Sequence, residues 1–249
     1  MGFSTLALLG GFGVFVGVMI GGVGIGGVLL VPVLTYIFAI DVHVAIAAAM
    51  FSYLFSGLVG AVIYARRGSI NWPMALWLFA GATPAAFAGA LAASVVPARG
   101  LEFLIAFLVV FAGINALRSL DEHAFREGPQ KPAPLIAIGA VTGFGSALTG
   151  TGGPLVLVPL LVWLKVPALT AIGLSQAIQL PIAALATVGN FIYASVDLVV
   201  GGVIALALMT GAVIGARLAH ALSQAALRTV VAWVLVAVGL FLIGRILVA

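Results

Sequence analysis

Cysteine is absent from the 249 residues, and charged side chains make up only 6% of them. Without cysteine the chain can form no disulfide, no thiolate nucleophile and no cysteine-ligated metal or haem centre. The shortage of charge excludes more, because a water-soluble domain carries about 25% charged residues. Hydrophobic residues account for 64% of the chain, so lipid has to cover most of its surface. The composition predicts an all-α integral membrane protein.

The sequence also lacks the motifs that mark several functional classes. The ten Lys and Arg lie mostly between apolar runs, and they form no cluster of the kind that binds nucleic acid. There is no P-loop, no H-E-x-x-H motif and no pair of acidic residues inside one apolar run. We therefore expect no nucleic-acid partner, no enzymatic activity, no metal and no cofactor. The basic residues are better interpreted as topology signals.

What the chain does contain is a series of long apolar blocks separated by charges, prolines and glycines. A membrane-spanning helix needs about 20 such residues. The blocks run over residues 3–40, 43–65, 72–96, 101–118, 134–164, 168–194, 198–221 and 227–248. The sustained polar stretch, Arg118 to Pro134, lies between the fourth and fifth blocks. We predict a first transmembrane repeat at 1–118, a linker at 119–133 and a second repeat at 134–249.

The two halves resemble each other at a fixed spacing. The sequence Gly-Ile-Gly-Gly at 24–27 and the sequence Gly-Thr-Gly-Gly at 150–153 are 126 positions apart, and each precedes an apolar run that ends in proline. The same shift aligns Val-Ala-Ile at 44–46 with Thr-Ala-Ile at 170–172. Features that repeat in register indicate an internal duplication.

The first and fifth blocks are too long for one straight crossing. Each could be one long tilted helix, or a hairpin whose two arms meet at the glycines. If both are hairpins that return to their starting side, eight of the ten Lys and Arg lie on one face, and only Arg99 and Arg245 lie on the other. If each of these two blocks instead crosses the membrane once, six of the ten basic residues lie on one face and four on the other. The positive-inside rule favours the hairpins.

The hairpin topology has consequences for the whole fold. It places the linker in the cytoplasm and both termini in the periplasm. It also predicts two inverted-topology repeats, each a glycine-broken helical hairpin followed by three transmembrane helices. Inverted repeats with interrupted helices recur in secondary transporters.

The glycine clusters are the first candidate binding site. Unwound backbone at membrane depth persists only where protein buries it or a polar cavity meets it. The second arm of each hairpin begins just after the glycines, where its free N–H groups and positive dipole end can bind an anion. The alternative is close helix packing, for which membrane helices use glycine freely. The candidate residues are Gly24, Gly26, Gly27, Gly150, Thr151, Gly152 and Gly153.

Polar side chains inside apolar runs are the second candidate set. They should face the protein interior, because uncompensated polar groups are costly in hydrocarbon. Gln176 and Gln179 are three residues apart and share a helix face. The serines could instead bond to backbone carbonyls one turn earlier. The candidates are Ser52, Ser175, Gln176 and Gln179. No Lys or Arg lies deep within a span, so neutral donors would have to hold an anion.

The chain resembles the TauE/SafE family of sulfite exporters and related anion transporters. The resemblance rests on residues 24–32 and 150–159, on Gly-Ser-Ile-Asn-Trp at 68–72, and on Gly-Ala-Arg-Leu at 215–218. It implies export of sulfite, or of another small sulfur-containing or organic anion, across the inner membrane. Val28 follows the first glycines where Pro154 follows the second, so the two half-sites are expected to contribute unequally.

These observations predict a secondary transporter that works by alternating access, with lipid and a small sulfite-like anion as its partners. Coupling to the proton motive force is our hypothesis for its energy source. A passive anion channel or facilitator is the nearest alternative. A transporter of another small organic anion fits the same residues.

Overall fold

The computed structural model describes residues 3–24, 26–117, 131–164 and 166–221, together with the isolated positions Trp233, Val236, Leu240 and Gly244. For residues 108–117 and for Phe3, Pro154, Pro159, Val162, Trp163 and Ala168 it describes the backbone alone. Most of the predicted linker and almost all of the predicted last block therefore lie outside the described residues, as do Ile25 and Lys165.

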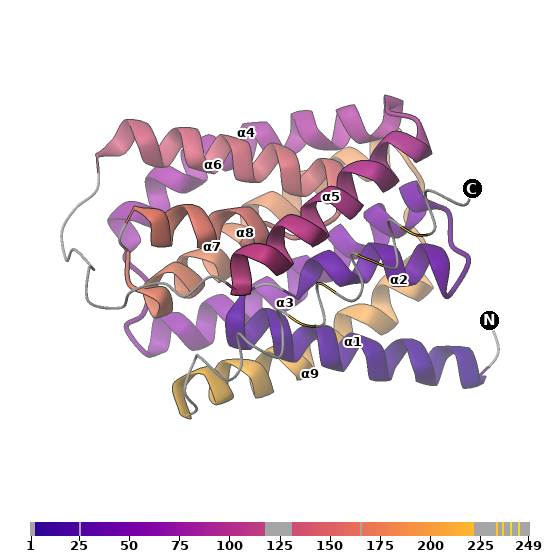
Figure 1. Cartoon of the computed structure of the whole chain (residues 1–249), viewed down its shortest axis with the longest axis horizontal. Coiled ribbons are helices and arrows are strands. Elements are labelled where there is room, and N and C mark those ends of the chain that lie inside the picture. Colours follow the sequence, from indigo (N-terminus) through magenta and orange to yellow (C-terminus); the bar gives the residue numbers. More distant parts are fainter. Residues whose placement is uncertain are drawn as a thin grey trace.

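Every regular element within the described residues is a helix, as the composition predicts (Figure 1). Six of the helices in the described part of the chain are long and apolar enough to cross a membrane. Leu8, Val95 and Leu206 on these helices are 69%, 75% and 70% exposed, as side chains in contact with lipid would be. The chain is an all-α multi-pass membrane protein. Its elements are α1 (Phe3–Val23), the 3₁₀ turn η1 (Gly27–Leu29), α2 (Leu30–Tyr36), α3 (Val42–Arg66), α4 (Trp72–Val95), α5 (Ala98–Leu117), α6 (Pro132–Thr149), α7 (Pro154–Trp163), α8 (Ala168–Tyr193) and α9 (Leu198–Ala221).

Helix ends recur at the spacing of the glycine clusters. Helix α1 ends at 23 and α6 at 149, α3 begins at 42 and α8 at 168, and α4 and α9 begin at 72 and 198. The starts of α4 and α9 share a cause: Asn71 and Asp197 each accept hydrogen bonds from backbone N–H groups of the first turn, at 3.0–3.2 Å. Such N-caps satisfy amides that a helix leaves free. Three pairs of helix ends therefore coincide at the 126-residue shift.

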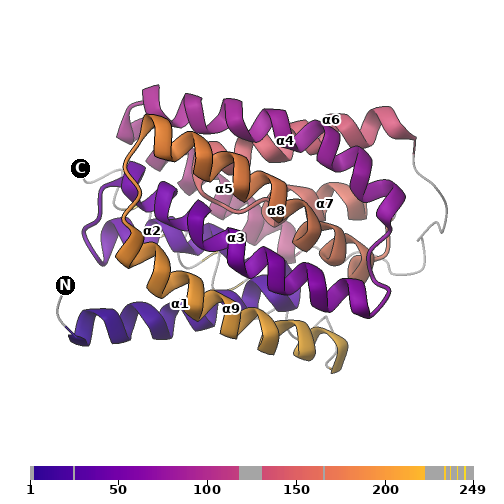
Figure 2. The ribbon, with the colours of Figure 1, turned by 180° about the vertical axis from the view of Figure 1, so that it is seen from behind.

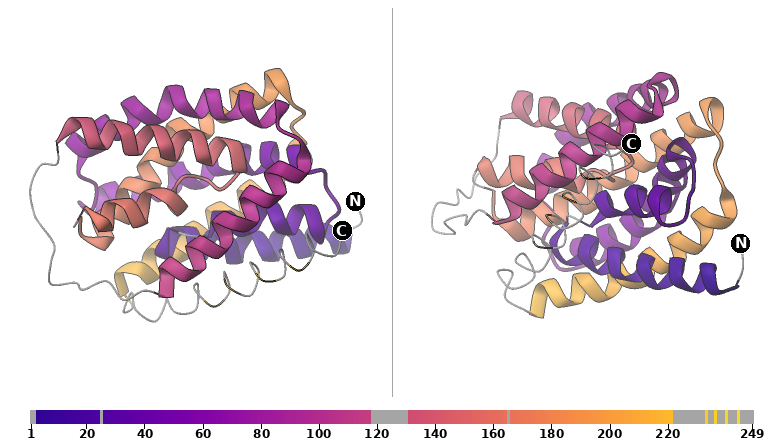
Figure 3. Two further views of the ribbon diagram at one scale, coloured as in Figure 1. Left: turned by 45° about the horizontal axis from the view of Figure 1, so that its top comes forward. Right: turned by 45° about the vertical axis from the view of Figure 1, so that its right-hand side comes forward.

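Each half packs its first helix against the other half. Helix α1 packs on α9, and α6 packs on α4. Both contacts need glycine, because a Cβ on Gly17 would collide with the backbone of Leu208, and one on Gly143 with that of Ala82. Those two contacts are again 126 positions apart. Helices α3 and α8 pack on each other and lie between α4 and α9 (Figure 2). Helix α5 crosses the bundle obliquely (Figure 3, left).

The two broken hairpins enter the bundle from opposite ends. In Figure 1, α1 starts at the right-hand end of the molecule and α6 starts at the left-hand end. Their 21 and 18 residues span about 31 and 27 Å at about 1.5 Å per residue. The return arms are shorter, since residues 27–36 and 154–163 number 10 each, or about 15 Å. Each block is thus divided at its glycines into a long arm and a half-length arm.

Candidate functional site

The glycines turn the chain sharply at both breaks. After α1, Gly24 has φ +77°, and after α6 the glycines at 150, 152 and 153 have φ +69°, +80° and +88°. An L-residue with a side chain pays about 1–2 kcal/mol in this region of backbone space. The break after α6 ends the helix in the left-handed conformation common at helix C-termini, with the N–H of Gly150 donating to the carbonyl of Ser146 at 2.9 Å.

The two glycine breaks, residues 24–27 (the first tip) and residues 150–153 (the second tip), touch each other inside the protein. A Cβ on Gly27 would lie 2.5 Å from the carbonyl oxygen of Thr151, and one on Gly150 would lie 2.6 Å from Val31 of α2. These residues are buried. Because α1 and α6 enter from opposite ends, their tips meet in the interior. Gly26 packs back on its own hairpin, where a Cβ would lie 2.6 Å from the carbonyl of Val16.

Tyr53 of α3 lies between the two tips, and sequence reasoning missed it. The side chain is fully buried, and its hydroxyl donates to the carbonyl of Gly27 at 2.7 Å. Its ring faces the other tip, since a Cβ on Gly152 would lie 3.0 Å from Cε2. Tyr53 thus fastens the first tip and packs against the second. The sequence contained one signal for it, since the repeat spacing of 126 residues aligns Tyr53 with the candidate residue Gln179.

Gln176 and Gln179 face α3 and the first tip, from one side of α8 as predicted. The Gln176 amide donates to the carbonyl of Ile20 at 2.7 Å, and the Gln179 amide donates to the carbonyl of Tyr53 at 3.1 Å. The glycines of α3 make room for both side chains. A Cβ on Gly60 would collide with the Gln176 carbonyl, and one on Gly57 would lie 3.2 Å from Gln179. In this arrangement both amide nitrogens bond to protein.

The two predicted serines are not grouped with the tips by any hydrogen bond. The Ser52 hydroxyl lies 2.7 Å from the carbonyl of Ala48 and 2.9 Å from that of Gly201, at the contact between α3 and α9. The Ser175 hydroxyl donates to Ile172 in its own helix at 2.7 Å. Both serines thus bond to backbone carbonyls of the preceding turn, which was the alternative interpretation of these residues in the sequence. Thr151 lies at the second tip, with its hydroxyl 3.1 Å from that of Thr149.

The second tip keeps buried polar groups that have no hydrogen-bond partner. The hydroxyls of Thr142 and Ser146 on α6 are 0% exposed and unpaired. They lie beside Gly153, whose Cβ would be 3.7 Å from the Ser146 Oγ and 3.9 Å from the Thr142 Cγ2. Farther along α8, the hydroxyl of Thr187 and the amide nitrogen of Asn190 are also buried without a partner. Thr142, Ser146 and Thr187 were not among the candidates predicted from the sequence.

The electrostatic character of this interior is neutral. Among the described residues, the buried polar side chains are Ser, Thr, Gln and Asn, with no Lys, Arg, Asp or Glu. A cavity of about 670 Å³ lies between α4, α5, α6 and α7, but its walls are apolar apart from Thr149, whose hydroxyl donates to Gly145 at 2.7 Å. That cavity suits hydrocarbon better than an anion. The unpaired hydroxyls of Thr142 and Ser146 lie instead beside Gly153 of the second tip.

The chain as a whole is similar to known membrane proteins. The model of the family described as sulfite exporter TauE/SafE matches residues 9–242. The chain belongs to this family. It is 24% identical over 238 residues to "Probable membrane transporter protein MJ0441" of Methanocaldococcus jannaschii, covering 89% of this chain and 88% of that one. It is 25% identical over 224 residues to "Probable membrane transporter protein YdhB" of Bacillus subtilis, covering 86% and 91%.

A third relative, "Probable membrane transporter protein" of Xylella fastidiosa, is 26% identical over 258 residues, covering 98% of this chain and 97% of that one. No solved structure matches the chain. Family and relatives together support membrane transport as the function of this TauE/SafE protein.

Proposed function

We propose that this TauE/SafE protein is a secondary transporter that exports a small sulfur-containing anion, sulfite or a related oxyanion or sulfonate, by alternating access. The observation that carries the proposal is the meeting of two glycine-broken tips in a buried, neutral and polar interior. Broken helices that meet at mid-depth are how many transporters build a substrate site. The sulfur anion comes from the family description.

The packing of the two halves supports alternating access. Exchanging the halves turns the contact of α1 with α9 into that of α6 with α4, and it turns the contact of α3 with α9 into that of α8 with α4. Such an exchange is what two inverted repeats produce, and α1 and α6 enter from opposite ends (Figure 1). A rocking motion of one repeat against the other would then open the tips to either side in turn.

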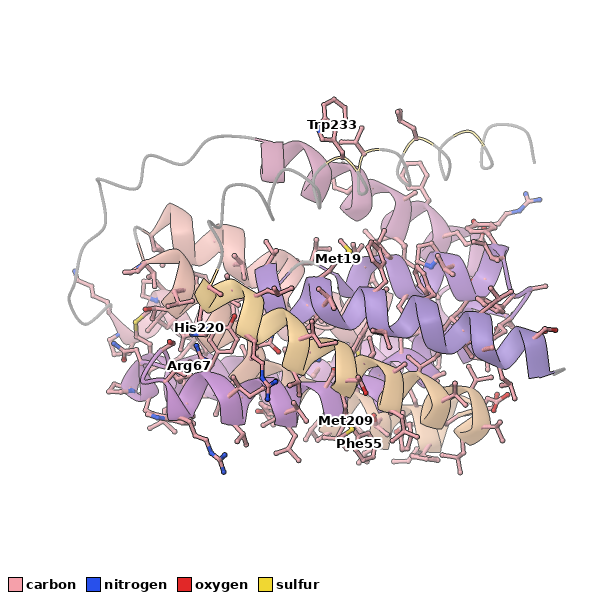
Figure 4. All side chains as sticks on the ribbon, turned by 90° about the horizontal axis from the view of Figure 1, so that it is seen from below. Met19, Phe55, Arg67, Met209, His220 and Trp233 are labelled. Carbon is pink, nitrogen blue, oxygen red and sulfur yellow. The ribbon has the colours of Figure 1, made fainter. Side chains whose placement is uncertain are left out.

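The positions of the described charges support the proposed orientation. Helices α3 and α9 end, and α6 begins, at one end of the bundle, where they carry Arg66, Arg67, Lys131 and Arg217 (Figure 1). Arg67 and His220 appear together at that end in Figure 4. Arg99 follows the start of α5 at the opposite end. The positive-inside rule then places the first end, with the linker, in the cytoplasm and the N-terminus in the periplasm.

The rival candidate is a passive anion channel. In the described structure the tips are in contact and are fastened by Tyr53 and Gln176, which favours a carrier that exposes its site by moving. We also propose coupling to the proton motive force, although the described interior contains no carboxylate that would relay a proton.

The test is uptake into proteoliposomes that contain the purified protein. Sulfite, sulfate, thiosulfate and short alkanesulfonates are offered in turn. A carrier shows a rate that saturates with concentration for at least one of them, whereas empty liposomes show none. A flux that rises linearly with concentration, with electrical currents far above carrier turnover, would establish a channel instead. No flux of any of these anions would refute the substrate class.

A further inference from the structure

The two tips are unequal at corresponding positions. The first half carries the apolar residues Val16 and Ile20 where the second carries Thr142 and Ser146, and all four are buried. Tyr64 has its hydroxyl on the carbonyl of Gly21 at 2.8 Å, which fastens the first tip a second time. The position that corresponds to Tyr64 in the second half is Asn190, and its amide nitrogen is unpaired. Carbonyls at and just before the first tip therefore accept hydrogen bonds from tyrosines of α3. In the second half, Thr142, Ser146 and Asn190 each keep an unpaired donor.

The return arms have ten residues each but begin differently. The first begins with the 3₁₀ turn η1, and only its last seven residues form helix α2. Helix α7 has ten residues and begins at Pro154, directly after the positive-φ Gly153. The first N–H groups of a helix have no partner within it, and they carry the positive end of the dipole. At α7 that end adjoins the unpaired hydroxyl of Ser146.

A buried hydroxyl without a partner destabilises a protein relative to one that is hydrogen-bonded. Thr142 and Ser146 are one helical turn apart, so their side chains share a face of α6. Two such groups beside a helix N-terminus are explained if a ligand is their partner during the transport cycle.

We infer that the transported anion binds at the second tip alone, between the N-terminus of α7 and the hydroxyls of Ser146 and Thr142, and that this site takes a monoanion. This inference rests on the proposed transport function. Its charge selectivity follows from the donors, which are all neutral in the described interior. The cost of removing an ion from water rises as the square of its charge, so a dianion loses roughly four times as much hydration energy as a monoanion of equal size. Two hydroxyls and a single helix N-terminus are too few neutral donors to replace the hydration shell of a dianion.

The location is tested with two variants that remove one hydroxyl each, Ser146→Ala and Thr142→Val. Neither hydroxyl has a partner in the protein, so the unfolding temperature of the empty protein in detergent should not fall. The apparent KM for sulfite uptake should rise about ten-fold or more, because a hydrogen bond to a charged group is lost in each case. Matched controls are Ser94→Ala and Thr210→Val, whose hydroxyls bond to carbonyls of their own helices at 2.8 and 2.9 Å. Both controls should keep the wild-type KM.

The charge class is tested by competition against sulfite uptake at neutral pH. Methanesulfonate, a monoanion, should inhibit at concentrations at least ten-fold lower than sulfate, a dianion. Equal inhibition by both would overturn the monoanion assignment. An unchanged KM in both Ser146→Ala and Thr142→Val, with saturable uptake intact, would overturn the location and leave the transport function standing. If the wild-type protein moves no anion at all, the transport function and this inference fail together.

Discussion

Tyr53→Phe is the sharpest test of how the two tips are held together. The change removes one oxygen and keeps the ring that packs against Gly152. It leaves the carbonyl of Gly27, at 2.7 Å from the hydroxyl in the structure, without this donor in a buried place. The carbonyl keeps the backbone N–H of Leu30 as a second donor, so the cost is that of one lost hydrogen bond, about 0.5–1.5 kcal/mol. For a chain of this length, each kcal/mol lowers the unfolding temperature by about 2–4 °C, so a fall of about 1–6 °C is expected.

The assay is thermal unfolding of the purified protein in detergent, with sulfite uptake measured on the same preparations. Uptake should also fall several-fold, because the first tip is no longer fixed against α3. Tyr193→Phe is the matched control: Tyr193 is 45% exposed, and its ring contact with Phe87 would be kept. Wild-type unfolding temperature and wild-type uptake in Tyr53→Phe would refute the role assigned to this hydroxyl.

Three further predictions concern the tips and the coupling. Gly152→Leu should abolish sulfite uptake while the protein still reaches the membrane, because the new side chain would collide with Tyr53 and the backbone φ is +80°. Gly202→Leu should keep uptake, because nothing lies within 4 Å of its Cβ. Equal activity of the two variants would remove the tip from the mechanism. Gln176→Ala should lower the unfolding temperature by about 1–6 °C, because the carbonyl of Ile20 loses the side-chain amide and keeps only the N–H of Gly24. An unaltered melting curve would count against this contact. An imposed proton gradient should change the rate of sulfite transport, and equal rates with and without the gradient would exclude proton coupling.

Much of the helical framework could be predicted because it depends on local chemistry. Charges and prolines between apolar blocks mark helix ends, and Asn71 and Asp197 cap helices where short polar side chains precede apolar runs. The breaks at Gly24 and Gly150 could be predicted for the same reason, since positive φ favours glycine. The spacing of 126 residues then related the two halves.

The partners of individual polar side chains could not be predicted, because they depend on which helices meet. Ser52 belongs to the α3–α9 contact and Gln176 to the first tip, although both are polar residues in similar apolar runs. Tyr53 was missed because its apolar ring gives no sign that its hydroxyl lies on a carbonyl 26 residues away. The unpaired state of Ser146 is a property of the assembled interior and leaves no trace in sequence.

The central claim is that the meeting tips form a carrier site, and counterflow tests it most directly. Proteoliposomes are loaded with unlabelled sulfite and diluted into a trace of radiolabelled sulfite. A carrier with one site exposed alternately to each side should accumulate the label transiently above its external concentration, and Gly152→Leu should not. Simple equilibration of the label without any overshoot, at the same rate in wild type and Gly152→Leu, would contradict the account.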